Sequence, residues 1–236
     1  MRINLKGELL IDEWAELYRC FGFDAGFYCP SDVRAALDEL EPEEELVLEI
    51  NSYGGCVDAA AEIYSMIQQA ASHGRTVRAE IQSLAASAAS YLILACSRVD
   101  IALPAQMMIH RSRLEMAGNA HDHERAVQML DVTDASILDV YCRKCGDKAD
   151  RAELERMMEA ETYIGARRCL ELGLVDGIIG EETGEDGAPL ALVASIADNV
   201  TRAMRTLPDI RDLIARRDKE NWEAKARLEL EAARYS

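Results

Sequence analysis

The sequence runs SLAASAASYLILAC over residues 83–96, and this uncharged stretch in an acidic chain decides the fold. Before it, residues 76–81 alternate between polar and apolar side chains, as strands do, whereas residues 88–95 have the composition of a helix. Ser87 is therefore expected at a strand-to-helix turn, between small neighbours. A nucleophilic serine needs this setting, because a substrate backbone can approach it and free backbone amides can hold an oxyanion.

A purely structural role is the alternative for Ser87. A serine among alanines at a helix start is more often an N-cap, so this stretch alone favours capping. It also lacks the glycines of a G-x-S-x-G elbow, because alanines stand at both positions. A nucleophilic role therefore requires that other parts of the chain supply a base and an oxyanion site.

Composition limits the class of protein. The chain has 236 residues, of which 49% are hydrophobic, enough for one large domain with an appendage. Its net charge of −17 argues against nucleic-acid binding, which needs clustered Lys and Arg. The N-terminal MRINLKGELL lacks the apolar region of a signal peptide, and no apolar run is long enough to cross a bilayer. We expect a cytosolic, reduced protein with no membrane partner.

Two motifs that could bind ligands are set aside. Cys142 and Cys145 form one C-x-x-C, but a zinc site needs a second pair, which the seven cysteines do not provide. Residues 51–55, NSYGG, follow a strand candidate and precede a helix, yet contain neither G-x-G-x-x-G nor G-K-[ST]. We therefore expect no metal or nucleotide, and a tight turn at the glycine pair. That turn is either a plain connection or a loop whose amides face a reacting carbonyl.

Short strands alternate with helices, which predicts an α/β fold with mainly parallel strands. The pattern predicts an edge strand at residues 2–10, an irregular segment at 11–29, and a helix opened by Pro30 and capped by Ser31. Further strands are expected at residues 46–50, 76–82, 99–102 and 107–110. The remaining elements are helices at 123–144, 150–159 and 166–172, the last ended by Gly173, and extended segments at 160–164 and 174–179.

The domain boundary is expected in the acidic, breaker-rich run EETGEDGAP at residues 181–189. It separates a domain at residues 1–180 from an acidic linker with a short helix at 181–208. A charged C-terminal helix follows at residues 209–236, for which disorder is the alternative.

Four histidines are available as a base: His73, His110, His121 and His123. His121 and His123 are two residues apart and point to different sides of a helix, so a metal pair is not expected. His73 is typical of a helix end. His110 ends the apolar strand after the Ser87 helix, so it can reach the same edge of the sheet. Together with the glycine loop and Ser87, this position favours a role as base.

These motifs resemble, in order and spacing, the Clp protease proteolytic subunit family. The matching segments are residues 50–55 (INSYGG), 85–87 (AAS), 108–110 (MIH) and 173–176 (GLVD), and the resemblance spans residues 2–180. Residues 118–120 and 158–162 look like the phage and prophage branch, described as head maturation proteases. The resemblance implies a crotonase-like core of repeated β-β-α units that stacks into ring-shaped homo-oligomers. The helix at residues 123–144 would interlock the rings, and the C-terminal helical part is an extension of this core.

The resemblance also implies roles for single residues. Ser87 matches the nucleophile and His110 the general base. Gly55 and Ala88 match the backbone amide donors of the oxyanion hole. The implied chemistry is acyl transfer without metal or cofactor.

The third triad position departs from the best-known members of the family. Glu161 stands where they have an aspartate, and its extra methylene changes the reach of the carboxylate. Asp131 and Asp134 on the long helix are alternatives. Tyr53 and Ala89 replace a proline and a glycine of the family pattern.

Together these features predict a serine endopeptidase acting on protein substrates, with capsid or scaffold proteins as candidates. One competing interpretation is a catalytically silent scaffold or assembly protein that keeps the fold. Another is an acyl-CoA enzyme on the same core, which the pairing of Ser87 with His110 argues against. The sequence identifies no unfoldase partner.

Overall fold

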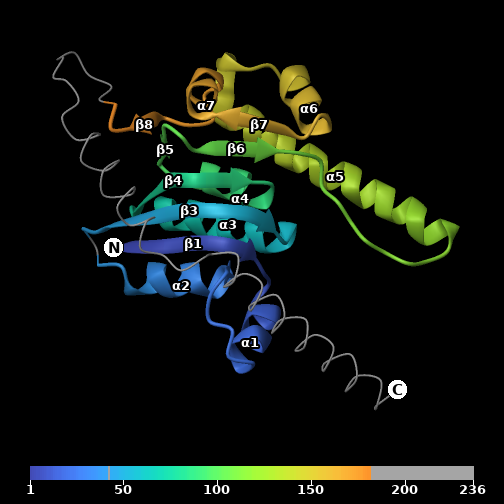
Figure 1. Cartoon of the computed structure of the whole chain (residues 1–236), viewed down its shortest axis with the longest axis horizontal. Coiled ribbons are helices and arrows are strands. Elements are labelled where there is room, and N and C mark those ends of the chain that lie inside the picture. Colours follow the sequence, from blue (N-terminus) through green and yellow to red (C-terminus); the bar gives the residue numbers. More distant parts are fainter. Residues whose placement is uncertain (42, 182–236) are drawn as a thin grey trace, which may run out of the picture. The chain divides into compact units, whose positions relative to one another are not determined.

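A mostly parallel β-sheet organises the part of the chain that the computed structural model describes, residues 1–41 and 43–181 (Figure 1). Its main path runs β2-β1-β3-β4-β5-β8, and β6 pairs with both β4 and β7. Every pairing is parallel except that of β6 with β7, so the predicted α/β fold with mainly parallel strands is confirmed. The strands are β1 (Arg2–Leu9), β2 (Phe27–Tyr28), β3 (Glu45–Gly55), β4 (Thr76–Ala86), β5 (Arg98–Ala102), β6 (Gln106–Ile109), β7 (Thr162–Gly165) and β8 (Gly177–Ile179).

β4 changes its neighbour partway along its length. Its first half pairs with β5, up to Ile81 opposite Ile101. From Leu84 onward its partner is β6, with Ala86 opposite Met108. The end of β4 therefore lies beside the end of β6, although the two ends are far apart in the sequence.

α3 (Val57–Ser72) and α4 (Ala88–Leu92) lie against the apolar face of this sheet, whereas α5 (Ala120–Cys145) projects away from it (Figure 1). Alternate residues of the strands, such as Leu48 of β3 and Ile81 of β4, share one core with Ile63 and Ile67 of α3. The period of two along each strand places these residues on one face. The helical elements are α1 (Asp12–Cys20), α2 (Pro30–Glu39), α3 (Val57–Ser72), α4 (Ala88–Leu92), η1 (Ile93–Ala95), α5 (Ala120–Cys145), η2 (Gly146–Lys148), α6 (Arg151–Glu159) and α7 (Ala166–Leu172).

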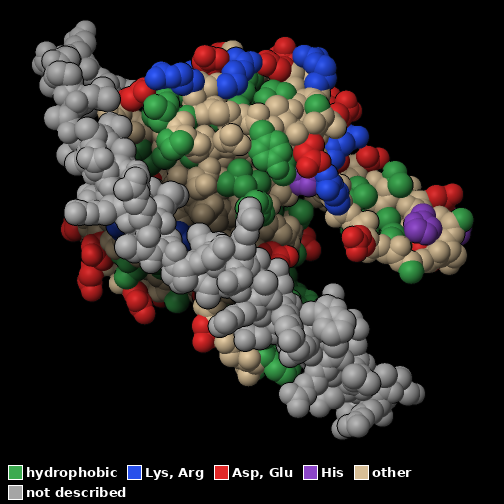
Figure 2. Space-filling model, viewed as in Figure 1, with side chains coloured by type: hydrophobic (Ala, Val, Ile, Leu, Met, Phe, Trp, Pro, Cys, Tyr) green, Lys and Arg blue, Asp and Glu red, His purple; other side chains and the backbone are tan. Residues whose placement is uncertain are grey.

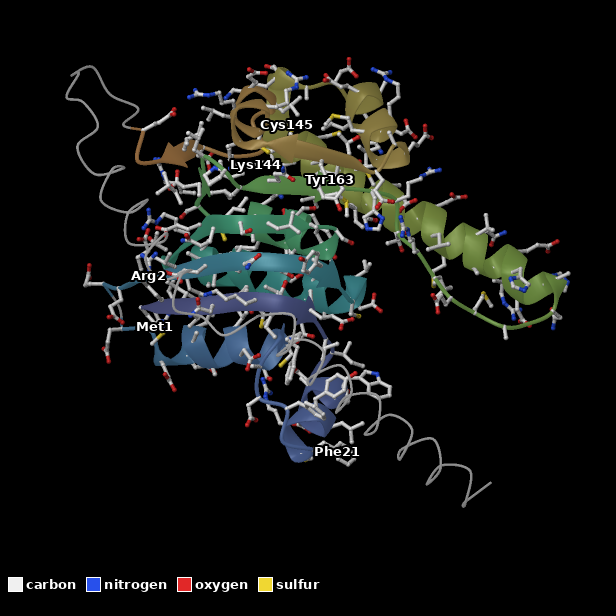
Figure 3. All side chains as sticks on the ribbon, in the orientation of Figure 1. Met1, Arg2, Phe21, Lys144, Cys145 and Tyr163 are labelled. Carbon is white, nitrogen blue, oxygen red and sulfur yellow. The ribbon has the colours of Figure 1, made fainter. Side chains whose placement is uncertain are left out.

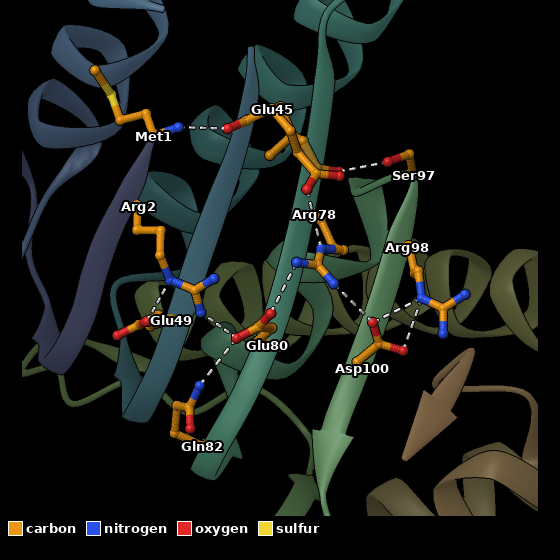
Figure 4. A network of polar contacts seen from close by, with 11 residues as sticks. Met1, Arg2, Glu45, Glu49, Arg78, Glu80, Gln82, Ser97, Arg98 and Asp100 are labelled. Carbon is orange, nitrogen blue, oxygen red and sulfur yellow. Dashed lines mark hydrogen bonds and ion pairs between the residues drawn. The ribbon is translucent and has the colours of Figure 1, made fainter. Parts of the chain in front are cut away.

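The other face of the sheet carries a network of charged side chains (Figure 4). Arginines and carboxylates occupy successive outward positions, so each arginine reaches carboxylates one step along the strands. Arg78, for example, lies 3.0 Å from Glu80 and 3.5 Å from Asp100. Mutual pairing allows the Asp100 side chain to be only 7% exposed. The members are Arg2, Glu45, Glu49, Arg78, Glu80, Arg98 and Asp100.

The prediction of an irregular segment at residues 11–29 is wrong, because α1 and β2 lie within it. Trp14, Leu17 and Tyr18 have the spacing of an apolar helix face, but the prediction did not use this short pattern, and in the structure only Ala15 of α1 is buried. β2 adds a strand outside β1, so β1 is not the edge strand. β2 is only two residues long, too short to show the alternation by which strands are predicted.

Cys29, not Ser31, is the N-cap of α2. The carboxylate of Asp32 accepts a hydrogen bond from the Cys29 amide at 3.0 Å, which completes a capping box. Pro30 occupies the first helical position, where its missing N–H costs nothing. The prediction failed because cysteine is not among the usual capping residues.

The glycine pair is not a turn after a short strand, because β3 continues through Gly55. Gly54 has φ 93° and Gly55 φ 149°, and a Cβ on Gly55 would lie 2.1 Å from the carbonyl oxygen of Leu9. Gly55 therefore allows β3 to run close against β1 at this point.

The other predicted elements are present near their expected places. The helices predicted at residues 123–144, 150–159 and 166–172 are α5, α6 and α7, and Gly173 ends the last one with φ 78°. None of the helices in the described ranges has the length and hydropathy needed to cross a membrane. Apart from Glu181, the predicted boundary at residues 181–189 and the helices predicted beyond it lie outside the described residues.

Removing side-chain volume from the centre of the sheet tests this core. Ile81 is fully buried on β4, so Ile81→Ala is expected to lower the free energy of unfolding by about 2–5 kcal/mol through the cavity it leaves. Urea denaturation followed by circular dichroism measures the change. Thr76→Ala, at the exposed start of β4, is the control and should change it by about 0.5 kcal/mol or less. Equal effects of the two substitutions would contradict the position of Ile81 in the core.

Candidate active site

Ser87 joins β4 to α4 in a strained backbone conformation. β4 ends at Ala86, α4 begins at Ala88, and Ser87 between them has φ 55° and ψ −128°. Its amide donates a hydrogen bond to the carbonyl of Met108 at 2.8 Å, which ties the turn to β6. The predicted strand-to-helix turn is confirmed. Its positive φ is uncommon for a residue other than glycine, and strain of this kind tends to be kept at functional sites.

His110 follows β6 and meets Ser87 across the sheet edge. Its Nε2 lies 2.6 Å from Ser87 Oγ, and both residues are half-buried. The pairing of β6 with the second half of β4 produces this approach. A base at this distance can remove the hydroxyl proton directly. The structure thus brings together the predicted nucleophile and the predicted base.

The other ring nitrogen of His110, Nδ1, is buried and has no hydrogen-bond partner among the described residues. When Nε2 accepts the serine proton, Nδ1 is the nitrogen that carries a hydrogen, so a buried donor is left unsatisfied. This is where a carboxylate holds the imidazole in serine triads. Nδ1 therefore marks the place where the site is incomplete in this structure.

Burial lowers the pKa of His110, and the positive charge of Arg113 lowers it further. The carboxylates of Glu161 and Asp134 act in the opposite direction but do not outweigh these causes. A lowered pKa keeps the ring neutral at physiological pH, and only the neutral ring can accept a proton.

Glu161 lies near His110 but does not contact it. Its carboxylate pairs with Arg113 and is 44% exposed. Its backbone has φ 50°, which makes it the second non-glycine residue with a positive φ among the described residues. The hydrogen bond to His110 that the family resemblance implies is absent from the described contacts, because Arg113 holds the carboxylate.

Asp134, one of the two alternatives on α5, anchors the chain that follows His110. Its Oδ1 accepts from the amide and the hydroxyl of Ser112 at 2.7 and 2.6 Å, and its Oδ2 lies 3.1 Å from Arg111. Both oxygens are therefore occupied by residues just after the histidine. Asp131, the other alternative, is exposed.

The glycine pair of β3 adjoins the Ser87 turn. A Cβ on Gly54 would lie 2.7 Å from Ser87 Cβ and 2.9 Å from the Ala88 nitrogen, so only glycine permits this approach. Gly55 follows directly, and Ala88 is the neighbour of Ser87 in the chain. The backbone segments of both predicted oxyanion donors are thus brought to the nucleophile.

Ser52 supports the site, a role that was not predicted from the sequence. Its buried hydroxyl donates to the Gly7 carbonyl at 2.7 Å and accepts from the Gly54 amide and the Tyr28 hydroxyl, each at 3.0 Å. Burial raises the pKa of Tyr28 to about 12, so this hydroxyl remains a donor. The available signal was a polar residue in register with the core-facing Leu48 and Ile50 of the same strand.

Comparisons with known proteins relate the chain to peptidases. The model of a family described as Clp protease matches residues 34–182. ATP-dependent Clp protease proteolytic subunit 1 of Chlamydia muridarum is 33% identical over 147 residues, which cover 61% of this chain and 74% of that protein. The subunits of the same name from Chlamydia trachomatis serovar D and serovar A show the same identity and coverage.

Removing the Ser52 hydroxyl tests the support of the glycine pair. Ser52→Ala leaves the Tyr28 hydroxyl and the Gly54 amide without their buried partner, so it should lower the free energy of unfolding by about 1–3 kcal/mol. Urea denaturation measures this. Ser65→Ala is the control, because its exposed hydroxyl bonds only to the Ala61 carbonyl within its own helix. A loss no larger than in the control would show that Ser52 does not support the pair.

Proposed function

The chain belongs to the Clp protease family, a family of serine peptidases, and we propose that Ser87 is its nucleophile in an endopeptidase acting on proteins. The observation that carries the proposal is the 2.6 Å separation of Ser87 Oγ and His110 Nε2 at a strained turn. A capping serine needs neither the positive φ nor a histidine at hydrogen-bond distance. Hence the nucleophilic role is favoured over the structural one.

The reaction is acyl transfer in two steps. His110 takes the proton of Ser87 as the oxygen attacks the peptide carbonyl carbon, and the amides of Gly55 and Ala88 stabilise the oxyanion. His110 then protonates the leaving amine as the scissile bond breaks, which leaves an ester on Ser87. Water, deprotonated by His110, attacks this ester and releases the acid. No step requires a metal or a cofactor.

Glu161 completes the triad in this proposal. Its charge already acts on His110, and a change of partner from Arg113 to Nδ1 would satisfy the buried nitrogen. Asp134 is the weaker candidate because both of its oxygens already bind residues after the histidine. Arg113 therefore competes with His110 for the carboxylate.

A ring-shaped homo-oligomer held together by α5 is part of the proposal. The first half of α5 projects from the sheet, and its side chains stand clear of the other described elements (Figures 1 and 3). All buried residues of α5 lie at or after Asp134. The projecting half exposes apolar side chains among charged ones (Figure 2), namely Val127, Met129 and Val132. Such a surface is typical of a protein interface.

We also propose that the chain belongs to the phage and prophage branch of the family, whose substrates would include capsid or scaffold proteins. The similarity of residues 118–120 and 158–162 to that branch supports this. Cleavage of co-expressed capsid and scaffold proteins by the wild type, but not by Ser87→Ala, is the corresponding assay. The catalytically silent scaffold is the competing outcome of the labelling experiment below.

Labelling with a fluorophosphonate probe tests the nucleophile. The assembled wild type should be labelled at Ser87, and Ser87→Ala should lose the label. His110→Ala should slow labelling by roughly 10²-fold or more, because the base is missing. Ser83→Ala, at an exposed serine of the same strand, is the control and should label at the wild-type rate. A folded, assembled wild type that takes up no label would support the silent scaffold.

The pH profile of kcat/KM tests the groups around His110. Activity should rise with pH through an apparent pKa below the usual value for histidine, since the base must be neutral and the pKa of His110 is lowered. Arg113→Ala removes a charge that lowers this pKa, so the rising part of the profile at low pH (the acid limb) should move to higher pH. Glu161→Gln removes a charge that raises it, so the limb should move to lower pH, and kcat should fall.

Arg34→Ala is the control for the pH profile, because Arg34 pairs with Glu62 away from the site. It should leave the acid limb in place. If Arg113→Ala and Glu161→Gln also leave it in place, neither group acts on the base. Full kcat in Glu161→Gln would mean that another carboxylate orients His110.

A further inference from the structure

A buried chain of hydrogen bonds joins α5 to the peptide bond that follows the nucleophile. The Ser90 hydroxyl donates to the carbonyl oxygen of Ser87 at 2.6 Å, and the Ser90 amide donates to the same oxygen at 2.9 Å. The hydroxyl oxygens of Tyr141 and Ser90 lie 2.6 Å apart. Because Ser90 gives its one hydroxyl hydrogen to the carbonyl, Tyr141 must be the donor between the two hydroxyls. Donation therefore runs from Tyr141 to Ser90 to the Ser87 carbonyl.

These hydroxyls lie where water does not compete. Tyr141 is 1% exposed and Ser90 is fully buried. Burial raises the pKa of Tyr141, so its hydroxyl keeps its proton and remains a donor. Hydrogen bonds in such surroundings are strong and polarise one another along a chain.

The carbonyl at the end of this chain shares a peptide unit with the Ala88 amide. A peptide unit is planar, so the direction of the Ser87 carbonyl sets the opposite direction of the Ala88 N–H. Two donors on the carbonyl also draw electron density toward its oxygen, which makes the N–H of the same unit a stronger donor. Ala88 is one of the two oxyanion donors in the proposed function.

We propose that Tyr141 and Ser90 are positioning residues that orient and polarise the Ala88 amide for the oxyanion. This inference rests on the proposed function, because it names what holds one of the donors. The Ser87 amide is held by Met108 and the Ser87 carbonyl by Ser90, so the strained residue is fixed on both sides. α5 thus acts on the oxyanion site without touching the substrate.

The chain offers matched controls for both hydroxyls. Tyr91 is buried, and its hydroxyl donates to the Val57 carbonyl at 2.6 Å, so Tyr91→Phe removes the same group from a bond that does not lead to the Ser87 carbonyl. Ser97 is exposed and donates its hydroxyl to the Val77 carbonyl at 2.8 Å, so Ser97→Ala removes a serine-to-carbonyl hydrogen bond outside this chain of hydroxyls.

Steady-state kinetics on the full-length oligomer is the first test. Reactive sites are counted by the fluorophosphonate probe, so a partly folded variant shows fewer sites rather than slower ones. Tyr141→Phe and Ser90→Ala should lower kcat per site by roughly tenfold, less than deletion of an oxyanion donor. KM should not change, because the amide acts in the transition state. The acid limb of the pH profile should not change either, because the hydrogen-bond chain from Tyr141 through Ser90 to the Ser87 carbonyl (the relay) does not touch His110. Tyr91→Phe and Ser97→Ala should keep the wild-type rate per site.

A magnetic resonance measurement tests the relay without activity. Ser87–Ala88 is the one Ser-Ala pair in the sequence, so carbonyl-¹³C serine combined with ¹⁵N alanine yields one carbonyl–amide correlation. Tyr141→Phe should move the Ala88 amide proton to lower chemical shift, because the polarising donor is lost. Tyr91→Phe should leave the correlation in place.

The two measurements separate the outcomes. An unmoved correlation in Tyr141→Phe overturns the relay. A moved correlation with a wild-type kcat per site overturns its effect on the oxyanion site. A wild type that never reacts with the probe overturns the proposed function instead, and the correlation still reports whether the relay exists.

Discussion

The change of partner along β4, from β5 to β6, is the constraint on which the candidate site depends. Main-chain hydrogen bonds place Ala86 opposite Met108, and the Ser87 amide closes onto the Met108 carbonyl at 2.8 Å. The distance between Ser87 and His110 is thus set by strand register, with little contribution from flexible side chains. The glycine pair at the end of β3 reaches the same point because Gly54 has no Cβ to collide with Ser87.

Buried hydrogen bonds hold this arrangement, but one buried nitrogen of the site has no hydrogen-bond partner among the described residues. Ser52 satisfies the Gly54 amide of β3, and Ser90 with Tyr141 satisfies the Ser87 carbonyl. His110 Nδ1 has no such partner among the described residues. An unsatisfied buried donor costs about 1–3 kcal/mol, which is free energy available to draw a carboxylate onto the ring. The proposed chemistry therefore requires one rearrangement, the movement of the Glu161 carboxylate from Arg113 to Nδ1 of His110. The nucleophile and the backbone around it are already in place.

Predictions from local pattern succeeded where one element carried its own signal. The helix at residues 166–172 and its glycine stop agree with the structure because composition and the left-handed C′ residue are local features. The prediction missed α1, although Trp14, Leu17 and Tyr18 have the spacing of a helix face, and it missed Cys29, which caps α2 without being a usual cap. It also placed a turn at Gly54–Gly55, because close packing against β1 cannot be distinguished from a turn by residue type.

Residue order was enough to predict the alternation of strands and helices, the serine between small residues and the histidine at a strand end, because each depends on neighbours in the chain. The fold was needed to show that Arg113 holds Glu161, that Ser52 is a buried support, and that Tyr141 reaches Ser90 across 51 positions. These contacts join elements distant in the chain. Their partners follow from which elements pack together, and no local period or composition records that packing.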